Sequence, residues 1–332
     1  MKQVKSNKYL YGIIPVIGAC LLLCGCTGDK TTSEIVLKAG FSTGASDPRV
    51  IATELFKSEV EEATDGRIKI EIYPDSQLGA DSDLIKGVVN GTVDITASSA
   101  GNFASYEPNV GISAFPFLFD NFEDAWNFVD GNIETKAEEG LGDYNIKVLG
   151  HYDNGFRCVT TSDNVGPINS VSDMDGLIIR TPENQIVMQT MLLLGATPKV
   201  LPFNELYDAL KTGQFEAQEN PIPVIYNNNL YEVQSNLAIT NHSYDVMLFV
   251  IRDDIWQKLS DEDKEIITNA AMKAQELDRQ LISEQTDEYI AKLSEEGMNI
   301  TYPDLAEFRA ATSDAVNLFR DSYDADLLKL IR

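Results

Sequence analysis

Anion binding is the chemistry that one short stretch of the sequence indicates. In LIIRTPENQ, residues 177–185, an apolar segment runs directly into Arg180, and Thr181 and Pro182 follow. Ligands bind open α/β sheets at the carboxyl ends of the strands, so a strand that ends on Arg180 places its guanidinium at that edge. Thr181 suits the N-cap and Pro182 the first turn of a following helix, whose free N–H groups carry partial positive charge. An arginine beside a helix N-terminus makes an anion site that a carboxylate fits, and a structural ion pair, for example with Glu183, is the other interpretation that this local pattern leaves open.

Catalytic and metal-binding residue types are scarce. The only histidines are His151 and His242, and Cys158 is the only cysteine after residue 26. Zinc sites and Cys–His nucleophile pairs need such residues close together, and nothing in the spacing groups them. We expect Cys158 to be a buried strand residue rather than a thiol activated by the neighbouring Arg157. The sequence thus predicts no catalytic residue, no metal site and no cofactor.

The charge balance limits the possible partners. The chain has 332 residues, enough for two domains of ordinary size. It carries 52 Asp and Glu against 26 Lys and Arg, which argues against a nucleic-acid partner, because phosphate binding requires a basic surface. An anionic small molecule is not excluded, since salt screens distant charges within about 10 Å and a local arginine can still bind the anion.

The first 26 residues have the pattern of an export signal. Three lysines precede an apolar run over residues 9–23, which is short for a membrane span. The ending LCGC, residues 23–26, resembles a bacterial lipoprotein box with Cys26 as the lipidated residue, and Cys20 is a second candidate. A plain signal peptide or an uncleaved anchor is the alternative. We expect export, a lipid anchor at the outer face of the cytoplasmic membrane, and a polar tether over residues 27–33.

Alternating strand and helix patterns predict an α/β architecture with two groups of elements. The first group comprises strands 34–42, 67–74 and 92–98 and helices 50–64 and 82–90. The second comprises strands 144–152, 156–162 and 176–180 and helices 182–194 and 204–212, the last with Asn204 as N-cap. Residues 83–95 and 205–217 align without gaps, which favours two similar lobes, although helix–glycine–strand units also recur by chance.

One long helix, or two nearly continuous ones, is predicted over residues 259–297. Ser260 has an acid three residues later, which makes a capping box at the start. A rise of about 1.5 Å per residue makes the helix roughly 50 Å long, enough to cross both lobes. A coiled-coil dimer is the other interpretation, but the apolar positions do not hold a strict heptad, and we expect a monomer.

A set of motifs in order resembles the solute-binding proteins of TRAP transporters. The motifs are GRIKIEIYPDSQLG (66–79), GFRCVTTS (155–162), a strand ending in Arg180, LGATP (194–198), ELYDAL (205–210) and QENP (218–221). The resemblance runs from about residue 35 to the end. It implies a two-lobe, periplasmic-binding-protein-like α/β fold (type II) with hinge strands and a long helix across both lobes. We expect lobe I to comprise residues 34–155 and 246–285, and lobe II residues 156–245 and 286–332.

The same resemblance implies a ligand site. Arg180 matches the arginine that clamps the ligand carboxylate, and Arg157 matches one that faces the ligand in many members. Asn220 matches a hydrogen-bond donor, and Phe203 matches an aromatic wall. The further candidates are Asp81, Ser99, Ser42, Asp47 and Glu183.

The implied function is to bind a small organic acid and deliver it to a sodium-driven membrane permease. RTPENQ, residues 180–185, resembles members that bind uronates or related sugar acids, whereas Ser99 stands where sialic-acid binders carry a glutamate. Ala217 replaces a glycine that is common before QENP, which leaves that backbone turn open. The alternatives are a C4-dicarboxylate ligand, a ligand sensor that presents its closed form to a receptor, and an exported enzyme that acts on sugar acids.

Overall fold

A computed structural model of the chain describes residues 34–331, and a mixed sheet organises this part. The described sheet has nine strands in the order β2-β1-β3-β8-β4-β7-β5-β6, and β9 pairs with β8. The strands are β1 (Ile35–Gly40), β2 (Ile68–Tyr73), β3 (Ile95–Ser99), β4 (Ile146–Thr161), β5 (Ile178–Thr181), β6 (Thr197–Val200), β7 (Ala217–Pro221), β8 (Asn236–Arg252) and β9 (Asn299–Thr301).

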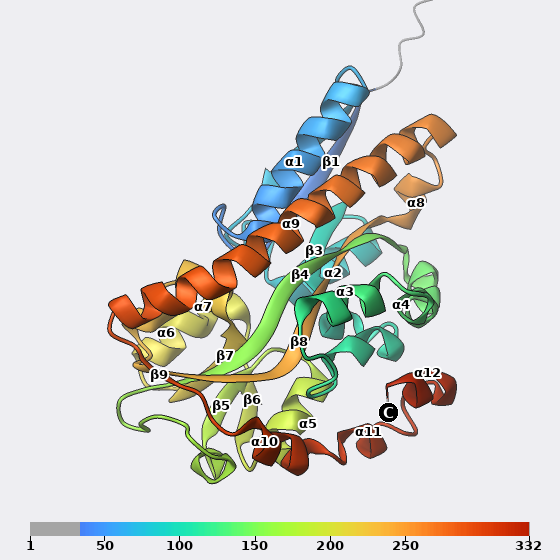
Figure 1. The fold of residues 1–332 in the computed structure, drawn as a ribbon. Coiled ribbons are helices and arrows are strands. Elements are labelled where there is room, and N and C mark those ends of the chain that lie inside the picture. The colour runs from blue at the N-terminus through green and yellow to red at the C-terminus, as the bar shows by residue number, and fades with distance from the viewer. Residues whose placement is uncertain (1–33, 332) are drawn as a thin grey trace, which may run out of the picture. The chain divides into compact units, whose positions relative to one another are not determined.

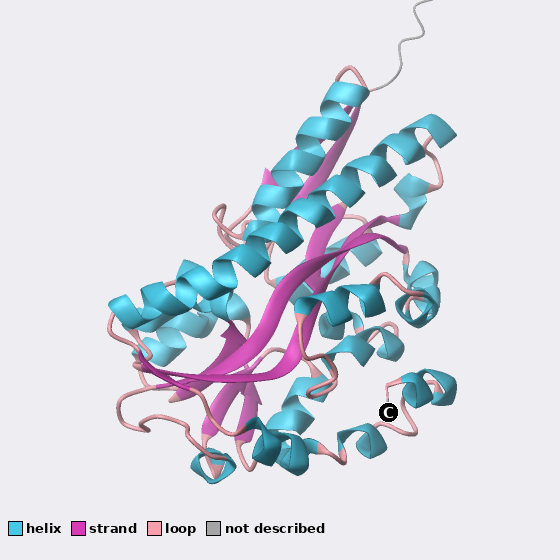
Figure 2. Cartoon of the chain, viewed as in Figure 1, coloured by secondary structure: helices cyan, strands magenta, loops and turns pink. Residues whose placement is uncertain are grey.

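Helices and short 3-10 turns connect the strands (Figure 2). The α-helices are α1 (Pro48–Ala63), α2 (Asp81–Asn90), α3 (Phe122–Val129), α4 (Asn132–Ala137), α5 (Gln185–Leu193), α6 (Leu206–Lys211), α7 (Ile222–Asn227), α8 (Asp253–Trp256), α9 (Asp261–Glu295), α10 (Leu305–Thr312), α11 (Ala315–Leu318) and α12 (Ala325–Leu330). The 3-10 turns are η1 (Ala100–Phe103), η2 (Pro108–Ala114), η3 (Glu139–Tyr144), η4 (Val171–Met174), η5 (Phe203–Glu205) and η6 (Leu230–Glu232).

The sheet has two similar halves, one on each side of a central strand pair. In the first half, β1 pairs in parallel with β2 and β3, and β3 pairs antiparallel with β8. In the second half, β5 pairs in parallel with β6 and β7, and β7 pairs antiparallel with β4. The aligned segments 83–95 and 205–217 each carry a helix and lead into the strand beside the central pair. The two-lobe α/β architecture predicted from the sequence is confirmed.

The central strands β4 and β8 pass from one half to the other (Figure 1). The sequence predicts two strands here, 144–152 and 156–162, but β4 is one strand of 16 residues. Its pairing with β8 shifts register between Asp153 and Gly155, where Gly155 has a φ of 100°. Glycine adopts this backbone without steric cost, so the strand bulges at the predicted break and pairing then resumes. These are the hinge strands that the resemblance implies.

Helix α9 crosses both halves, as predicted (Figure 1). It has 35 residues, and the Ser260 side chain caps it by accepting from the Asp263 backbone N–H at 3.1 Å. Near its start, Ile267 and Ala271 pack into the hydrophobic core formed with β1, β2 and α1. Near its end, Leu293 packs with residues of the second half such as Leu210 in α6. Its apolar positions therefore pack against both halves of the same chain.

Two predicted helix starts are wrong. Thr181 still belongs to β5, and the following helix begins at Gln185, because the Asn184 side chain accepts from two backbone N–H groups of the first turn. The N-cap predicted at Asn204 is also wrong, since a 3-10 turn takes in Asn204 and α6 begins only at Leu206. In both places more than one residue near the boundary suits a helix start, and tertiary packing selects the later one.

The C-terminal helices return towards the first half. Helix α10 contacts α5, whereas α12 contacts η2, and the rings of Phe115 and Phe319 meet edge to face at 5.5 Å. The lobe boundaries expected from the sequence, including residues 286–332 in lobe II, stay a prediction.

The predicted signal peptide (1–26), Cys26 and the tether (27–33) lie outside the described residues. Within residues 34–331, none of the helices combines the length and the apolar character needed to cross a membrane.

Candidate functional site

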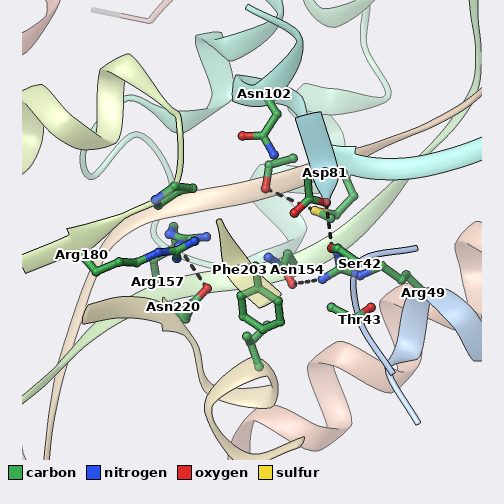
Figure 3. Close-up of a pocket in the computed structure, with 14 residues that line it drawn as sticks. Ser42, Thr43, Arg49, Asp81, Asn102, Asn154, Arg157, Arg180, Phe203 and Asn220 are labelled. Carbon is green, nitrogen blue, oxygen red and sulfur yellow. Dashed lines mark hydrogen bonds between the residues drawn. The ribbon is translucent and has the colours of Figure 1, made fainter. Parts of the chain in front are cut away.

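A cavity lies between the two halves of the sheet (Figure 3). The first half and β8 contribute Ser42, Thr43, Arg49, Asp81, Ser99, Asn102 and Met247; strand β4 contributes Asn154 and Arg157; and the second half contributes Arg180, Pro182, Phe203, Asn220 and Val224. In Figure 3 the two arginines Arg157 and Arg180 lie on one side, and Ser42 and Arg49 lie on the other. Most of the lining residues are polar or charged, which suits a hydrophilic anion.

Arg180, at the end of β5, is buried, with 2% of its surface exposed. Its Nε and Nη2 donate to the Leu201 carbonyl at 2.9 and 2.7 Å, and none of the described carboxylates forms an ion pair with it. Burial, together with the charge of Arg157, lowers the pKa of Arg180 to about 10, against the opposing influence of Glu219 and Asp81. At neutral pH the guanidinium is still protonated, so an uncompensated positive charge borders the cavity. The alternative interpretation, an ion pair with Glu183, is wrong.

Arg157 lines the same cavity but is neutralised by the protein. Its Nε forms an ion pair with Glu219, and its Nη1 donates to Asp245 at 2.5 Å. Burial opposes the charge, but the attraction of Glu219 and Asp245 outweighs it and raises the pKa of Arg157. Nη2 also donates to the Asn220 side-chain oxygen at 3.1 Å, which fixes that amide at the cavity wall. Arg157 therefore holds the Asn220 amide and the two carboxylates in place in the cavity wall.

Hydroxyl and carboxylate groups face these arginines from the first half. Asp81, the first residue of α2, accepts hydrogen bonds at Oδ1 from the hydroxyls of Ser42 at 2.9 Å and Ser98 at 3.0 Å. The Ser99 hydroxyl donates to Asp245 at 3.0 Å. Phe203, in η5, lines the cavity with a half-buried ring.

The structure brings most of the predicted site residues together. The ones that line the cavity are Arg180, Arg157, Asn220, Phe203, Asp81, Ser99 and Ser42. Glu183 lies beside it, in an adjoining cavity that also borders Arg180 and Asp81. Asp47 lies outside the lining: its carboxylate caps α1 and pairs with Arg49 at 2.8 Å, and its contact with the ligand stays a prediction.

Sequence reasoning missed four polar lining residues, Thr43, Arg49, Asn102 and Asn154. Arg49 had a detectable signal, because a basic residue in the first turn of a helix opposes the helix dipole. Its Nη2 donates to the Asn154 side chain at 3.0 Å, which links the first half to β4. Thr43, Asn102 and Asn154 had no such signal, since their sequence environments resemble ordinary turns.

Metal and thiol chemistry find no support in the described residues. No group of three or more His, Cys, Asp or Glu in residues 34–331 could hold a metal ion. Cys158 is fully buried, and burial raises the pKa of its thiol to about 11. The expected buried strand cysteine is confirmed.

Comparisons with known proteins agree with this geometry. The family model for bacterial extracellular solute-binding proteins of family 7, DctP, matches residues 39–322. The 2,3-diketo-L-gulonate-binding periplasmic protein YiaO of Escherichia coli is 33% identical over 320 residues, 94% of this chain and 96% of YiaO. The sialic acid-binding periplasmic protein SiaP of Vibrio cholerae is 33% identical over 283 residues, 85% of this chain and 87% of SiaP.

Among solved structures, a TRAP periplasmic solute-binding protein from Polaromonas sp. JS666, bound to D-erythronate, is similar with a TM-score of 0.86 and 32% identity. The match covers 90% of this chain and 98% of that one. Family model, relatives and fold agree over nearly the whole described chain, and this chain therefore belongs to the DctP family of extracellular solute-binding proteins of TRAP transporters.

Proposed function

We propose that this protein binds a sugar acid in the cavity between its lobes and delivers it to a sodium-driven TRAP permease. The observation that carries the proposal is the buried Arg180 guanidinium, which has no carboxylate partner among the described residues. A ligand carboxylate supplies the missing negative charge, and it fits the planar guanidinium well. The relatives point to the same class of ligand, because YiaO is named for 2,3-diketo-L-gulonate and the Polaromonas protein held D-erythronate.

The rest of the cavity suits the hydroxyl groups of such an acid. Asn102, Asn154 and Asp81 offer hydrogen-bonding groups around the same space, and Phe203 offers an apolar face for the carbon chain. Because the lining comes from both halves, a bound ligand stabilises the closed arrangement of the lobes through its greater affinity for that state. We assign no catalytic role to these residues, since the described lining includes neither an activated nucleophile nor a histidine.

The N-terminal pattern extends the proposal to the location of the protein. Export followed by lipidation at Cys26 would hold it at the outer face of the cytoplasmic membrane, as a monomer, near the permease. Mass spectrometry of the mature N-terminus tests this: a lipid-modified Cys26 at the first position is expected, and an unmodified Cys26 contradicts the anchor.

A thermal-shift screen tests the binding proposal. Uronates, aldonates, dicarboxylates and sialic acid are added in turn, because a ligand that binds only the folded state raises the melting temperature by mass action. We expect the largest shift from an aldonate or a uronate. If no acid in the panel shifts the melting temperature, the proposed function is wrong.

A further inference from the structure

Asp81 is the second charge in the cavity that the protein leaves uncompensated. The cavity's other arginines have carboxylate partners, since Arg49 pairs with Asp47 and Arg157 pairs with Glu219 and Asp245. Asp81 has only hydroxyl partners, and both donate to the same oxygen, Oδ1. None of the described lysines, arginines or histidines forms an ion pair with Asp81.

The cavity is therefore polarised from one lobe to the other. Arg180 provides a positive charge from the end of β5, and Asp81 provides a negative charge from the start of α2. Both border the main cavity and the space that adjoins it, so a ligand that fills either one meets both charges. Asp81 favours the protonated forms of both Arg49 and Arg180, although burial and Arg157 leave the pKa of Arg180 lowered. Its charge therefore lies within electrostatic range of a carboxylate bound at Arg180.

We infer that Asp81 makes the site selective for acids with a single carboxylate and a hydroxyl-bearing far end, and excludes dicarboxylates of the same length. This inference rests on the proposed function. With the ligand carboxylate at Arg180, a hydroxyl at the far end can donate to the Oδ2 atom of Asp81. A second carboxylate in its place cannot donate, and it adds a like charge in a partly desolvated space.

Two pairs of ligands isolate this difference. Galactonate and galactarate differ only in one end group, a CH₂OH in the first and a carboxylate in the second, and D-erythronate and meso-tartrate form the same pair with four carbons. Calorimetric titration of the wild-type protein should give at least tenfold tighter binding of the monoacid in the pair whose length fits the cavity. Equal affinities for monoacid and diacid in both pairs would overturn the inference.

The variant Asp81→Asn tests the residue directly. Asparagine keeps the size and can still accept from Ser42 and Ser98, but it loses the charge and can donate to a carboxylate. We expect the preference for the monoacid to fall at least tenfold, through weaker monoacid binding and stronger diacid binding. The matched control is Asp83→Asn, which removes the same charge from the same helical turn, where the carboxylate accepts from the Ala80 N–H outside the cavity.

The outcomes distinguish a failure of the role of Asp81 from a failure of the proposed function. If the wild type binds monoacids but Asp81→Asn keeps the preference, or Asp83→Asn changes it equally, the role of Asp81 is wrong and the proposed function stands. If the wild type binds none of the four acids, the inference about Asp81 falls, and the thermal-shift panel with uronates decides the proposed function. Thermal unfolding of each variant without ligand shows whether the protein is folded, and Asp81→Glu, which restores the charge, should restore the preference.

Discussion

Arg157 and Arg180 border one cavity and are both buried, with 3% and 2% of their surfaces exposed, but the protein neutralises only Arg157. Two carboxylates from β7 and β8 surround Arg157, whereas within residues 34–331 Arg180 has only the Leu201 carbonyl as a hydrogen-bond partner. A buried charge costs free energy unless it is paired, so the Arg157 cluster is complete in the ligand-free protein and Arg180 is complete only with an anion. Arg157 therefore has a structural role in the cavity wall, whereas Arg180 is available to bind the ligand.

Removing Arg157 gives the largest expected effect on stability. Arg157→Leu leaves Glu219 and Asp245 buried without a cation, which should lower the free energy of unfolding by about 3–5 kcal/mol. Urea unfolding of the ligand-free protein measures it. As a control, Lys273→Leu breaks an exposed pair with Glu59 and should cost less than about 1 kcal/mol. A loss for Arg157→Leu as small as that of the control would show that the buried cluster is not structural.

Removing Arg180 should affect binding instead of stability. Arg180→Leu leaves no described carboxylate unpaired and removes a buried charge, which offsets the loss of the two hydrogen bonds to the Leu201 carbonyl, so the free energy of unfolding without ligand should change by less than about 2 kcal/mol. The affinity for the acid that stabilises the protein most should fall by about 3 kcal/mol, roughly a hundredfold, because the ligand carboxylate loses its charged donor. Calorimetry on the wild type and the variant measures both affinities. Unchanged affinity would show that Arg180 does not bind the ligand, and the proposed difference between Arg180 and Arg157 would be wrong.

Disturbing the contact between the lobes should weaken ligand binding by less than the removal of Arg180 does. A Cβ on Gly101 would lie 2.0 Å from Nδ2 and 2.5 Å from Cγ of Asn184, a side chain that is fixed because it caps α5. Gly101→Ala should therefore hold the lobes apart and weaken ligand binding about tenfold, the low end of the cost of overpacking. Gly142→Ala, with nothing within 4 Å, is the control and should bind normally. Equal affinities of the two variants would argue against closure at this contact.

The smallest effect is a pH dependence of binding. Arg180 must be protonated to bind an anion, and its pKa is lowered to about 10, so affinity should decline as the pH rises through 10. The carboxylate of a sugar acid is already ionised at these pH values, and the pKa of Arg157 is raised, so neither accounts for the change. Between pH 8 and 11 we expect a loss of up to about tenfold, one pKa unit beyond the midpoint. Calorimetry over the range in which circular dichroism shows a folded protein checks this, and constant affinity would contradict it.

Comparing the predicted with the observed helices and strands shows which features can be predicted from neighbouring residues alone. Ser260 is enough to predict the start of α9 correctly, because its side chain caps the helix through a residue only three positions away. Strand β4 is predicted as two strands, because the turn residues around Gly155 also suit a bulge, and only its pairing with β8 distinguishes the two. Likewise, Asp47 and Arg49 are two residues apart, and only the packing of α1 decides which one reaches the cavity.

The sequence by itself determined the α/β alternation, the long helix, the arginine at the end of a strand and the motif order that indicates the family, since these depend on neighbouring residues. Only the tertiary structure decided which arginine is paired. Glu219 and Asp245 lie 62 and 88 residues from Arg157 along the chain, and the pairing of β4 with β7 and β8 brings them into contact. The same folding buries Arg180 with no such partner among the described residues, because burial and ion pairing are properties of the assembled lobes.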